Sequence, residues 1–184
     1  MEKIEDLFNE PVANRTELAR CIGRAGFHDC AEIGVLEGGY SERMAQNIPG
    51  INLICVDTWE PSRNHRSARW MHVHFRTARR RLKDYNVRFM KMPSLEAAAL
   101  VPDQSLDFVY IDALHDAKSV MEDITAWEPK VRPGGVVAGH DWTHRGVTAA
   151  VESYVMLHNI APLYTTLSCE EDVNPSWYWI RKNG

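Results

Sequence analysis

Short apolar runs alternate along the chain with longer segments in which apolar residues recur at helical spacing. The runs are rich in β-branched and aromatic residues and have Gly, Pro, Asn or Asp near many of their ends, which predicts strands. The expected strands are residues 30–35, 51–57, 87–92, 106–113 and 134–141. The expected helices are residues 39–47, 64–84, 94–100, 116–127 and 145–158, and "RPGG" (132–135) is expected to be a turn. Such alternation predicts a parallel sheet with helices on both faces.

The pattern changes after residue 158, where "APLYTTLS" and "SWYWIRK" indicate two strands joined by a polar segment. We expect these two strands to pair as an antiparallel hairpin. The predicted fold is therefore α/β, with a doubly wound, mostly parallel seven-stranded sheet and a C-terminal antiparallel hairpin. The length of 184 residues fits one domain, residues 1–184. Its expected parts are a helical cap, an α/β core and the hairpin, at residues 1–29, 30–158 and 159–184.

Composition places the chain among ordinary globular proteins, with 45% hydrophobic and 25% charged residues and a net charge of −4. No apolar stretch approaches the ~20 residues that span a bilayer, and the N-terminal segment lacks a signal-peptide pattern. The four cysteines are widely spaced, which argues against a zinc site or a disulfide framework. We expect a protein of the reducing cytoplasm without a membrane partner, and the negative charge argues against nucleic acid as a partner.

Residues 63–91 are strongly basic, with ten of the 21 lysines and arginines against one acid, Asp84. One interpretation is a solvated helix face, and the other is a surface for an anionic substrate or for a second subunit of a homo-oligomer. His72 and His74 lie two positions apart, so they do not share a helix face, which argues against a metal pair. Residues 60–75 are also candidates for a lid or wall over a substrate site.

The stretch "AEIGVLEGG" (31–39) places Gly34, Gly38 and Gly39 between a predicted strand and a helix start. Ligands of α/β sheets bind beyond the carboxyl ends of the strands, and glycines there let a ligand approach the backbone closely. The helix start adds free N–H groups. Asp57 closes the second strand, where a carboxylate can accept hydrogen bonds from both hydroxyls of a ribose. The pattern predicts a site for an adenosine cofactor.

Two classes of adenosine cofactor are candidates, and the loop favours one of them. A dinucleotide requires G-x-G-x-x-G, whereas here Leu36 replaces the second glycine and Glu37 puts a carboxylate where phosphate charge would lie. Glu32 adds a further negative group. These acids oppose a pyrophosphate and suit a sulfonium ligand with an α-ammonium group. A nucleotide-dependent oxidoreductase is the less compatible alternative.

Four motifs in order, "AEIGVLEGG", "CVDTWE", "MPSLEAAALVPDQSLDFVYIDALHD" and "RPGGVVAGHDW", resemble the class I (Rossmann-type) S-adenosylmethionine-dependent methyltransferases. More narrowly, they resemble the branch with metal-assisted small-molecule O-methyltransferases and sugar O-methyltransferases of antibiotic pathways. The resemblance implies a Rossmann-like fold and a set of cofactor contacts. The methionine part would lie against Glu32, Gly34, Val35, Gly38 and Gly39, the ribose and adenosine against Asp57, Thr58 and Trp59, and the adenine against Ser94 and Leu95, with Asp112 beside the cofactor.

Some of these residues also have a purely structural interpretation. Ser94 could be a helix N-cap, Trp59 a core residue and Asp57 a turn residue. Gly39 could serve helix packing alone. These alternatives stay open at the level of sequence.

Transfer of a methyl group to oxygen requires that the acceptor hydroxyl lose its proton, to a general base or with the help of a divalent metal. Asp112 ends the fourth predicted strand, with His115 three residues on, and His140 and Asp141 end the fifth. Both strands end at the edge of the glycine loop, so we expect these side chains, together with Asp116, to converge on the cofactor.

The resemblance implies that Asp112 and Asp141 bind magnesium and that His115 is the base. His140 departs from the branch because it stands where a carboxylate is expected, and magnesium prefers oxygen ligands. The set of Asp112, His140 and Asp141 also suits manganese, iron or zinc. A metal-free site with His115 as base is the alternative. In structural terms, His115 could cap the next helix and His140 could be a hydrogen-bonded core residue.

The expected function is S-adenosylmethionine-dependent methyl transfer, with O-methylation of a small-molecule or sugar hydroxyl as the specific expectation. We expect acceptor specificity to come from the N-terminal helices and from residues 60–75 and 142–175. An alternative from another class is a non-catalytic binding or scaffold protein with a methyltransferase fold. The presence of Glu32, Asp57 and His115 together argues against that alternative.

Overall fold

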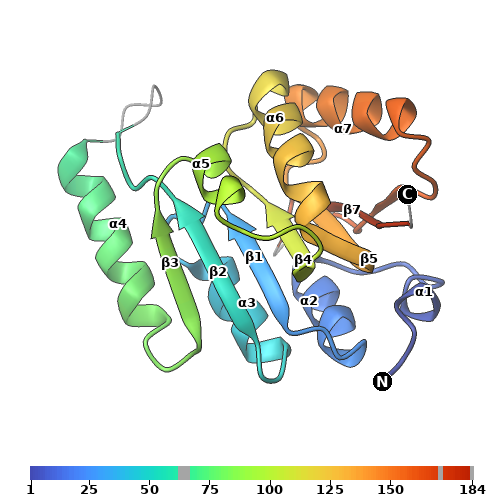
Figure 1. Ribbon diagram of the computed structural model, residues 1–184, viewed down its shortest axis with the longest axis horizontal. Helices are drawn as coiled ribbons and strands as arrows, with labels where there is room; N and C mark the ends of the chain where they lie inside the picture. The colour runs from blue at the N-terminus through green and yellow to red at the C-terminus, as the bar shows by residue number, and fades with distance from the viewer. Residues whose placement is uncertain (62–66, 170–171, 183–184) are drawn as a thin grey trace.

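The computed structural model describes residues 1–61, 67–169 and 172–182, in which a seven-stranded sheet lies between two layers of helices (Figure 1). The strands are β1 (Asp29–Ile33), β2 (Asn52–Asp57), β3 (Val87–Lys91), β4 (Leu106–Ile111), β5 (Val131–Gly139), β6 (Tyr164–Thr165) and β7 (Trp177–Ile180). The helices are α1 (Ile4–Leu7), α2 (Arg15–Arg24), α3 (Gly39–Asn47), α4 (Ala68–Arg81), α5 (Ser94–Ala99), α6 (Ala117–Trp127), the 3₁₀ turn η1 (Glu128–Lys130) and α7 (Arg145–Leu157). Part of the predicted basic segment (63–91) and of the predicted substrate wall (60–75) lies outside the described residues, including Arg63, His65 and Arg66.

The sheet has the order β3-β2-β1-β4-β5-β7-β6, and β1 to β5 are parallel. β1 pairs with β2 on one side and with β4 on the other, so the winding of the chain reverses at β1. In an open α/β sheet, ligands bind in the crevice beyond the carboxyl ends of the strands at such a reversal. β7 is antiparallel to both β5 and β6, which confirms the predicted Rossmann-like fold with its C-terminal hairpin.

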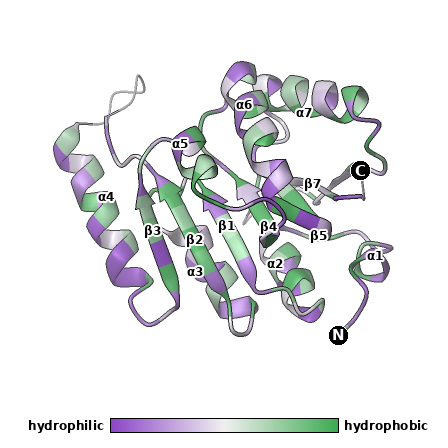
Figure 2. Cartoon of the chain, in the orientation of Figure 1, coloured by the Kyte–Doolittle hydropathy of each residue, from purple (hydrophilic) through white to green (hydrophobic). Residues whose placement is uncertain are grey.

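Two apolar clusters, one on each face of the sheet, hold the layers together. The cluster under α1 to α4 includes Leu18 and Met44, and the cluster under α5 to α7 includes Ile124. β4 supplies both clusters, because Phe108 packs into the first and Val109 into the second. Figure 2 shows the hydrophobic residues concentrated along the central strands, with many hydrophilic residues on α4. Among the described residues, no helix has the length and apolar character needed to cross a bilayer.

Three of the α-helices in the described part of the chain, α2, α4 and α6, begin after a side chain that accepts a hydrogen bond from the first turn. Asn14 caps α2 by accepting a hydrogen bond from the Glu17 amide at 3.0 Å. Asp116 caps α6 in the same way, with 3.0 Å between its Oδ1 and the Ser119 amide nitrogen. Asp116, which sequence analysis had grouped with the side chains that converge on the cofactor, is therefore the N-cap of α6. His115 does not cap this helix.

The segment "RPGG" does not form the expected turn, because β5 begins at Val131 and runs through it. The pairing of β4 with β5 shifts register between Leu106 and Phe108, and Gly134 adopts a φ of 80° within the strand. A Cβ on Gly135 would lie 2.6 Å from the Asp107 carbonyl oxygen. The two glycines therefore form an irregular, closely packed stretch of strand, which a sequence pattern cannot distinguish from a turn.

We predict that Leu18→Ala lowers the free energy of unfolding by about 2–5 kcal/mol, because the leucine side chain is fully buried between α2 and the sheet. The matched control is Leu157→Ala at the end of α7, where the side chain is 69% exposed. That change should stay within about 0.5 kcal/mol of the parent protein. Urea unfolding measures both, and equal effects of the two substitutions would contradict the proposed packing of α2.

Candidate active site

A cavity of about 800 Å³ opens beyond the carboxyl ends of β1, β2 and β4. Most of the predicted cofactor residues line it: Glu32, Gly34, Val35, Gly39, Asp57, Thr58, Ser94, Leu95 and Asp112. The predicted base His115 lines it as well. The volume lies within the range of small-molecule and cofactor sites. The reversal of winding at β1 therefore brings residues of three of the four sequence motifs, "AEIGVLEGG", "CVDTWE" and "MPSLEAAALVPDQSLDFVYIDALHD", to one cavity.

Backbone geometry keeps the glycine loop close to the end of β4. Gly34 has a φ of 92°, and a Cβ at this position would collide with the carbonyl group of Asp112. Gly38 adopts the left-handed conformation at the N-cap of α3 and faces Ala78 and Leu82 behind the cavity. The loop thus depends on Gly34 for its approach to β4 and on Gly38 for the start of the helix.

Asp57 organises this loop through hydrogen bonds from three backbone amides. Its Oδ2 accepts from the amides of Val35 at 3.1 Å and Leu36 at 2.9 Å, and its Oδ1 accepts from the Trp59 amide at 2.8 Å. The Trp59 side chain is 2% exposed, packs against Phe75 at 4.5 Å between ring centroids, and donates from its indole to the Leu36 carbonyl at 2.8 Å. Trp59 accordingly holds the loop from within the core.

Glu32 is a buried acid on the floor of the cavity. Its side chain accepts a short hydrogen bond from the Ser41 hydroxyl, and the whole residue is 2% exposed. Burial raises the pKa of Glu32 from its ordinary value of 4.5 to about 8, although the Ser41 hydrogen bond opposes that rise. A ligand cation placed beside Glu32 would favour the ionised carboxylate.

The far end of the cavity contains a buried acid that sequence analysis missed. Ser94 begins α5, and its hydroxyl accepts a hydrogen bond from the Trp127 indole at 2.8 Å, while Pro93 holds the N-cap position. Asp123 on α6 lines the same region, and burial raises its pKa to about 6. Asp123 lies on the same helix face as the buried Val120 and Trp127. A charged residue on that apolar face was the sequence signal that could have identified it as a buried acid.

Asp112, His115 and Asp141 form a compact cluster, and Asp112 and His115 line the cavity. One ligand atom from each lies within 4.8 Å of the others, which is the spacing that a metal ion requires. The His115 Nε2 lies 3.0 Å from Asp141 Oδ2 and 3.7 Å from Asp112 Oδ1. The nearby carboxylates of Asp112 and Asp141 raise the pKa of His115 to about 10. Asp141 has a φ of 57°, a conformation that aspartate tolerates better than most residues.

His140, which sequence analysis placed among the metal ligands, lies behind this cluster. Its Nε2 is 2.9 Å from Asp172 Oδ1, and its Nδ1 is 3.4 Å from Asp141 and 3.8 Å from Asp112. Burial lowers the pKa of His140, but hydrogen bonds with Asp141 and Asp172 outweigh it and raise the pKa to about 9. Sequence analysis missed Asp172 because it lies in the polar segment between the two hairpin strands.

α4 forms one wall of the cavity, to which it contributes Met71 and Arg81. His74 lies 2.7 Å from Glu37 of the glycine loop, and Arg81 lies 3.5 Å from Glu42 of α3. Other basic side chains of this helix are exposed: Arg69, Arg76, Arg79 and Arg80. The described part of the basic segment therefore combines a solvated face with one arginine at the cavity.

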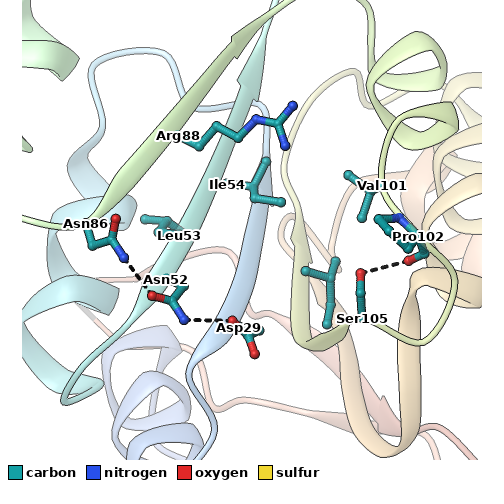
Figure 3. A pocket seen from close by; sticks show the side chains of 10 residues that line it. Asp29, Asn52, Leu53, Ile54, Asn86, Arg88, Val101, Pro102 and Ser105 are labelled. Atoms are coloured by element: carbon teal, nitrogen blue, oxygen red, sulfur yellow. Dashed lines mark hydrogen bonds between the residues drawn. The ribbon is translucent and has the colours of Figure 1, made fainter.

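A second cavity of about 240 Å³ lies at the opposite edge, where β1 and β2 begin (Figure 3). Asn86 donates to Asn52 at 2.6 Å, and Asn52 donates to Asp29 at 2.8 Å. The side chains of Asn86, Asn52 and Asp29 therefore form a chain of hydrogen bonds across the starts of neighbouring strands. All the motifs that predicted chemistry lie at the other edge of the sheet.

Residues 31–142, more than half of the chain, match the methyltransferase domain family. The chain belongs to this family. The match covers the glycine loop, Asp57 and the cluster from Asp112 to Asp141, and it confirms the assignment to the class I S-adenosylmethionine-dependent methyltransferases. A comparison with curated proteins found no match.

Solved structures share the fold of this methyltransferase at low sequence identity. The O-methyltransferase NovP is 21% identical, with 92% of this chain and 80% of that chain covered and a TM-score of 0.68. The O-methyltransferase TomG from Streptomyces achromogenes, in complex with SAM, is 18% identical, with coverages of 98% and 90% and a TM-score of 0.66. An rRNA methylase from Streptococcus thermophilus is 13% identical, with coverages of 95% and 100% and a TM-score of 0.68. The fold by itself therefore leaves the class of acceptor open.

We predict that Glu32→Gln removes a pH-dependent loss of stability from the ligand-free methyltransferase. Because the folded-state pKa of about 8 lies above the ordinary value of 4.5, the stabilisation is complete below pH 4.5 and is lost as pH rises through 8. The parent protein should therefore lose stability relative to the variant between these values. Urea unfolding at pH 5, 7 and 9 measures this, with exposed Glu96→Gln as control. Parallel stability curves for parent and variant would contradict the shifted pKa.

Proposed function

We propose that the protein transfers a methyl group from S-adenosylmethionine to a hydroxyl oxygen of a small molecule or sugar. The observation that carries the proposal is that one cavity is lined both by the acid-bearing glycine loop and by Asp112 and His115, with Asp141 3.0 Å from His115. When bound, S-adenosylmethionine supplies an electrophilic methyl group on a sulfonium cation. The loop residues would hold the cofactor, and the cluster would hold the acceptor oxygen beside it.

The cavity fits a cationic adenosine ligand better than a dinucleotide. Glu37 and Asp112 put negative charge around the glycine loop, which would repel a pyrophosphate and attract an ammonium or sulfonium group. Glu32 would add a further negative charge once a bound cation favoured its ionised form. Asp57 already accepts three backbone hydrogen bonds, and its carboxylate still lines the cavity. It can therefore shape the loop and receive the ribose hydroxyls at once. This supports a methyltransferase rather than a nucleotide-dependent oxidoreductase.

Asp112, His115 and Asp141 fit a divalent cation, with manganese favoured over magnesium because one donor is an imidazole nitrogen. Such an ion supplies Lewis acidity that lowers the pKa of a hydroxyl near it. A pKa of about 10 means that His115 holds its proton at neutral pH in the ligand-free protein. With an ion bound, His115 would be a ligand; without one, it would act as the general base only after an acceptor had offset the charge of the two aspartates.

The acceptor class is proposed from the chemistry of the cluster and from the O-methyltransferases that share the fold. A scaffold protein without activity is the alternative, and it gives no reason for three titratable side chains to converge beside the glycine loop. We also propose a location in the cytoplasm, since all four cysteines are free thiols and three of them are buried.

We predict that S-adenosylhomocysteine binds in the micromolar range, about −8 kcal/mol, and that NAD does not bind measurably. Asp57→Ala should weaken S-adenosylhomocysteine binding at least tenfold, because each hydrogen bond lost from a charged group weakens binding by about 1.5–3 kcal/mol. Asp84→Ala, at an exposed site after α4, is the control and should bind as the parent does. Calorimetry tests all three proteins, and tight NAD binding without S-adenosylhomocysteine binding would refute the proposed cofactor.

We predict that Mn²⁺ raises the melting temperature of the parent protein, since a ligand specific to the folded state stabilises it. Asp112→Asn and Asp141→Asn should abolish the shift, while Asp103→Asn, at an exposed site, should retain it. The shift should grow with pH, because His115 must lose its proton to become a ligand. Differential scanning fluorimetry from pH 6 to 9 measures this, and the absence of any shift with Mn²⁺ or Mg²⁺ would leave His115 as a metal-free base.

A further inference from the structure

Arg15, the first residue of α2, reaches the cavity from the N-terminal cap. It lines the cavity together with Glu32, Gly39, Tyr40 and Asp112. Its backbone position is fixed on both sides, because its amide donates to Asp172 at 3.2 Å and its carbonyl accepts from the Tyr40 hydroxyl at 3.0 Å. Its guanidinium carbon lies 5.4 Å from the centroid of the Tyr40 ring. The charged group is thus held beside the glycine loop.

The guanidinium of Arg15 has a buried N–H group that makes no hydrogen bond within the described part of the chain. Among the described residues, its Nε is buried and has no hydrogen-bond partner. The acids near it are distant, with 3.5 Å from Nε to Asp172 Oδ1 and 3.6 Å from an Nη to Asp112 Oδ2. Charge-assisted hydrogen bonds to a carboxylate are typically about 2.7–2.9 Å long. Arg15 is therefore positioned for a planar anionic group that would complete its hydrogen bonding.

An acidic group and a basic group line this part of the cavity. Glu32 offers a buried carboxylate, whereas Arg15 offers the fork of N–H donors that matches a carboxylate. The N-terminus of α3 begins at Gly39, also on the cavity wall, and its free amides add positive potential. An α-amino acid end, with an ammonium and a carboxylate on one carbon, is complementary to this pair.

We propose that Arg15 binds the α-carboxylate of the cofactor's amino-acid end, with Glu32 taking the ammonium group. The inference rests on the proposed function, because it assigns a residue to one end of the same cofactor. It gives the N-terminal cap a part in cofactor binding, where sequence analysis had expected only acceptor specificity. Arg15 is a binding residue in this scheme and performs no step of the transfer.

Two ligands that differ in the amino-acid end test the assignment. S-adenosylhomocysteine carries both charged groups, while 5′-methylthioadenosine keeps the adenosine and sulfur and lacks them. Arg15→Gln should weaken S-adenosylhomocysteine binding about 10- to 100-fold, the effect of losing a charge-assisted hydrogen bond pair. Binding of 5′-methylthioadenosine should change less than about twofold. Arg20→Gln, at an exposed arginine of the same helix that pairs with Glu17, should change neither.

Calorimetry with the full chain decides between the outcomes. Equal S-adenosylhomocysteine affinity in parent and Arg15→Gln would overturn the inference and leave Arg15 as a counter-charge to the aspartates. An equal loss for both ligands would also overturn it, because Arg15 would then only support the cavity. If the parent protein binds neither ligand, the proposed function fails and the inference with it.

A ligand-side measurement keeps the inference testable if Arg15→Gln does not fold. The parent protein should bind the decarboxylated analogue of S-adenosylhomocysteine 10- to 100-fold more weakly than S-adenosylhomocysteine itself. Arg15→Lys, which keeps the charge and loses the planar fork, should narrow that difference. An unchanged ratio in Arg15→Lys, or equal binding of the two ligands by the parent protein, would overturn the assignment.

Discussion

The close approach of Gly34 to the carbonyl group of Asp112 is the contact on which the site depends. It exists because β1 and β4 are neighbours in the sheet although more than seventy residues separate them in the chain. A side chain at Gly34 would push the glycine loop away from the end of β4. The pairing of Ile33 with Ile111 sets the ends of β1 and β4 side by side, and the absence of a Cβ at Gly34 lets the loop continue against Asp112.

Charge is the second constraint on this cavity. Four carboxylates, from Asp112, Asp141, Asp172 and Glu32, lie close together, and the ligand-free protein offsets them in different ways. Burial favours the neutral form of Glu32, whereas the two histidines hold their protons and Arg15 lies between Asp112 and Asp172. Binding of cations would replace these protons with permanent positive charge. The same arrangement would thus accommodate a cationic cofactor and the proposed metal ion.

Much of the fold was predictable because the central strands are uniformly apolar and the helices between them are amphipathic. The bounds of α3 match the prediction, and those of β3, α5 and α6 differ by one residue. The prediction failed at "RPGG", where glycines that normally mark a turn instead allow an irregular strand against Asp107. The prediction also made the first hairpin strand too long, since β6 has only two residues. Pairing with β7 sets the length of β6, and local composition does not reveal that pairing.

The sequence by itself determined which strand ends carry the residues proposed for cofactor binding and catalysis: the glycine loop with Glu32, the acid Asp57, and the pairs after β4 and β5. These signals are local, since each depends on a few adjacent residues next to an apolar run. Only the tertiary structure decided that Arg15 of the N-terminal cap, Asp123 of α6 and Asp172 of the hairpin reach the same region. Each is an ordinary polar residue in its own segment. Their roles come from burial and from neighbours far away in the chain, and no local pattern encodes those contacts.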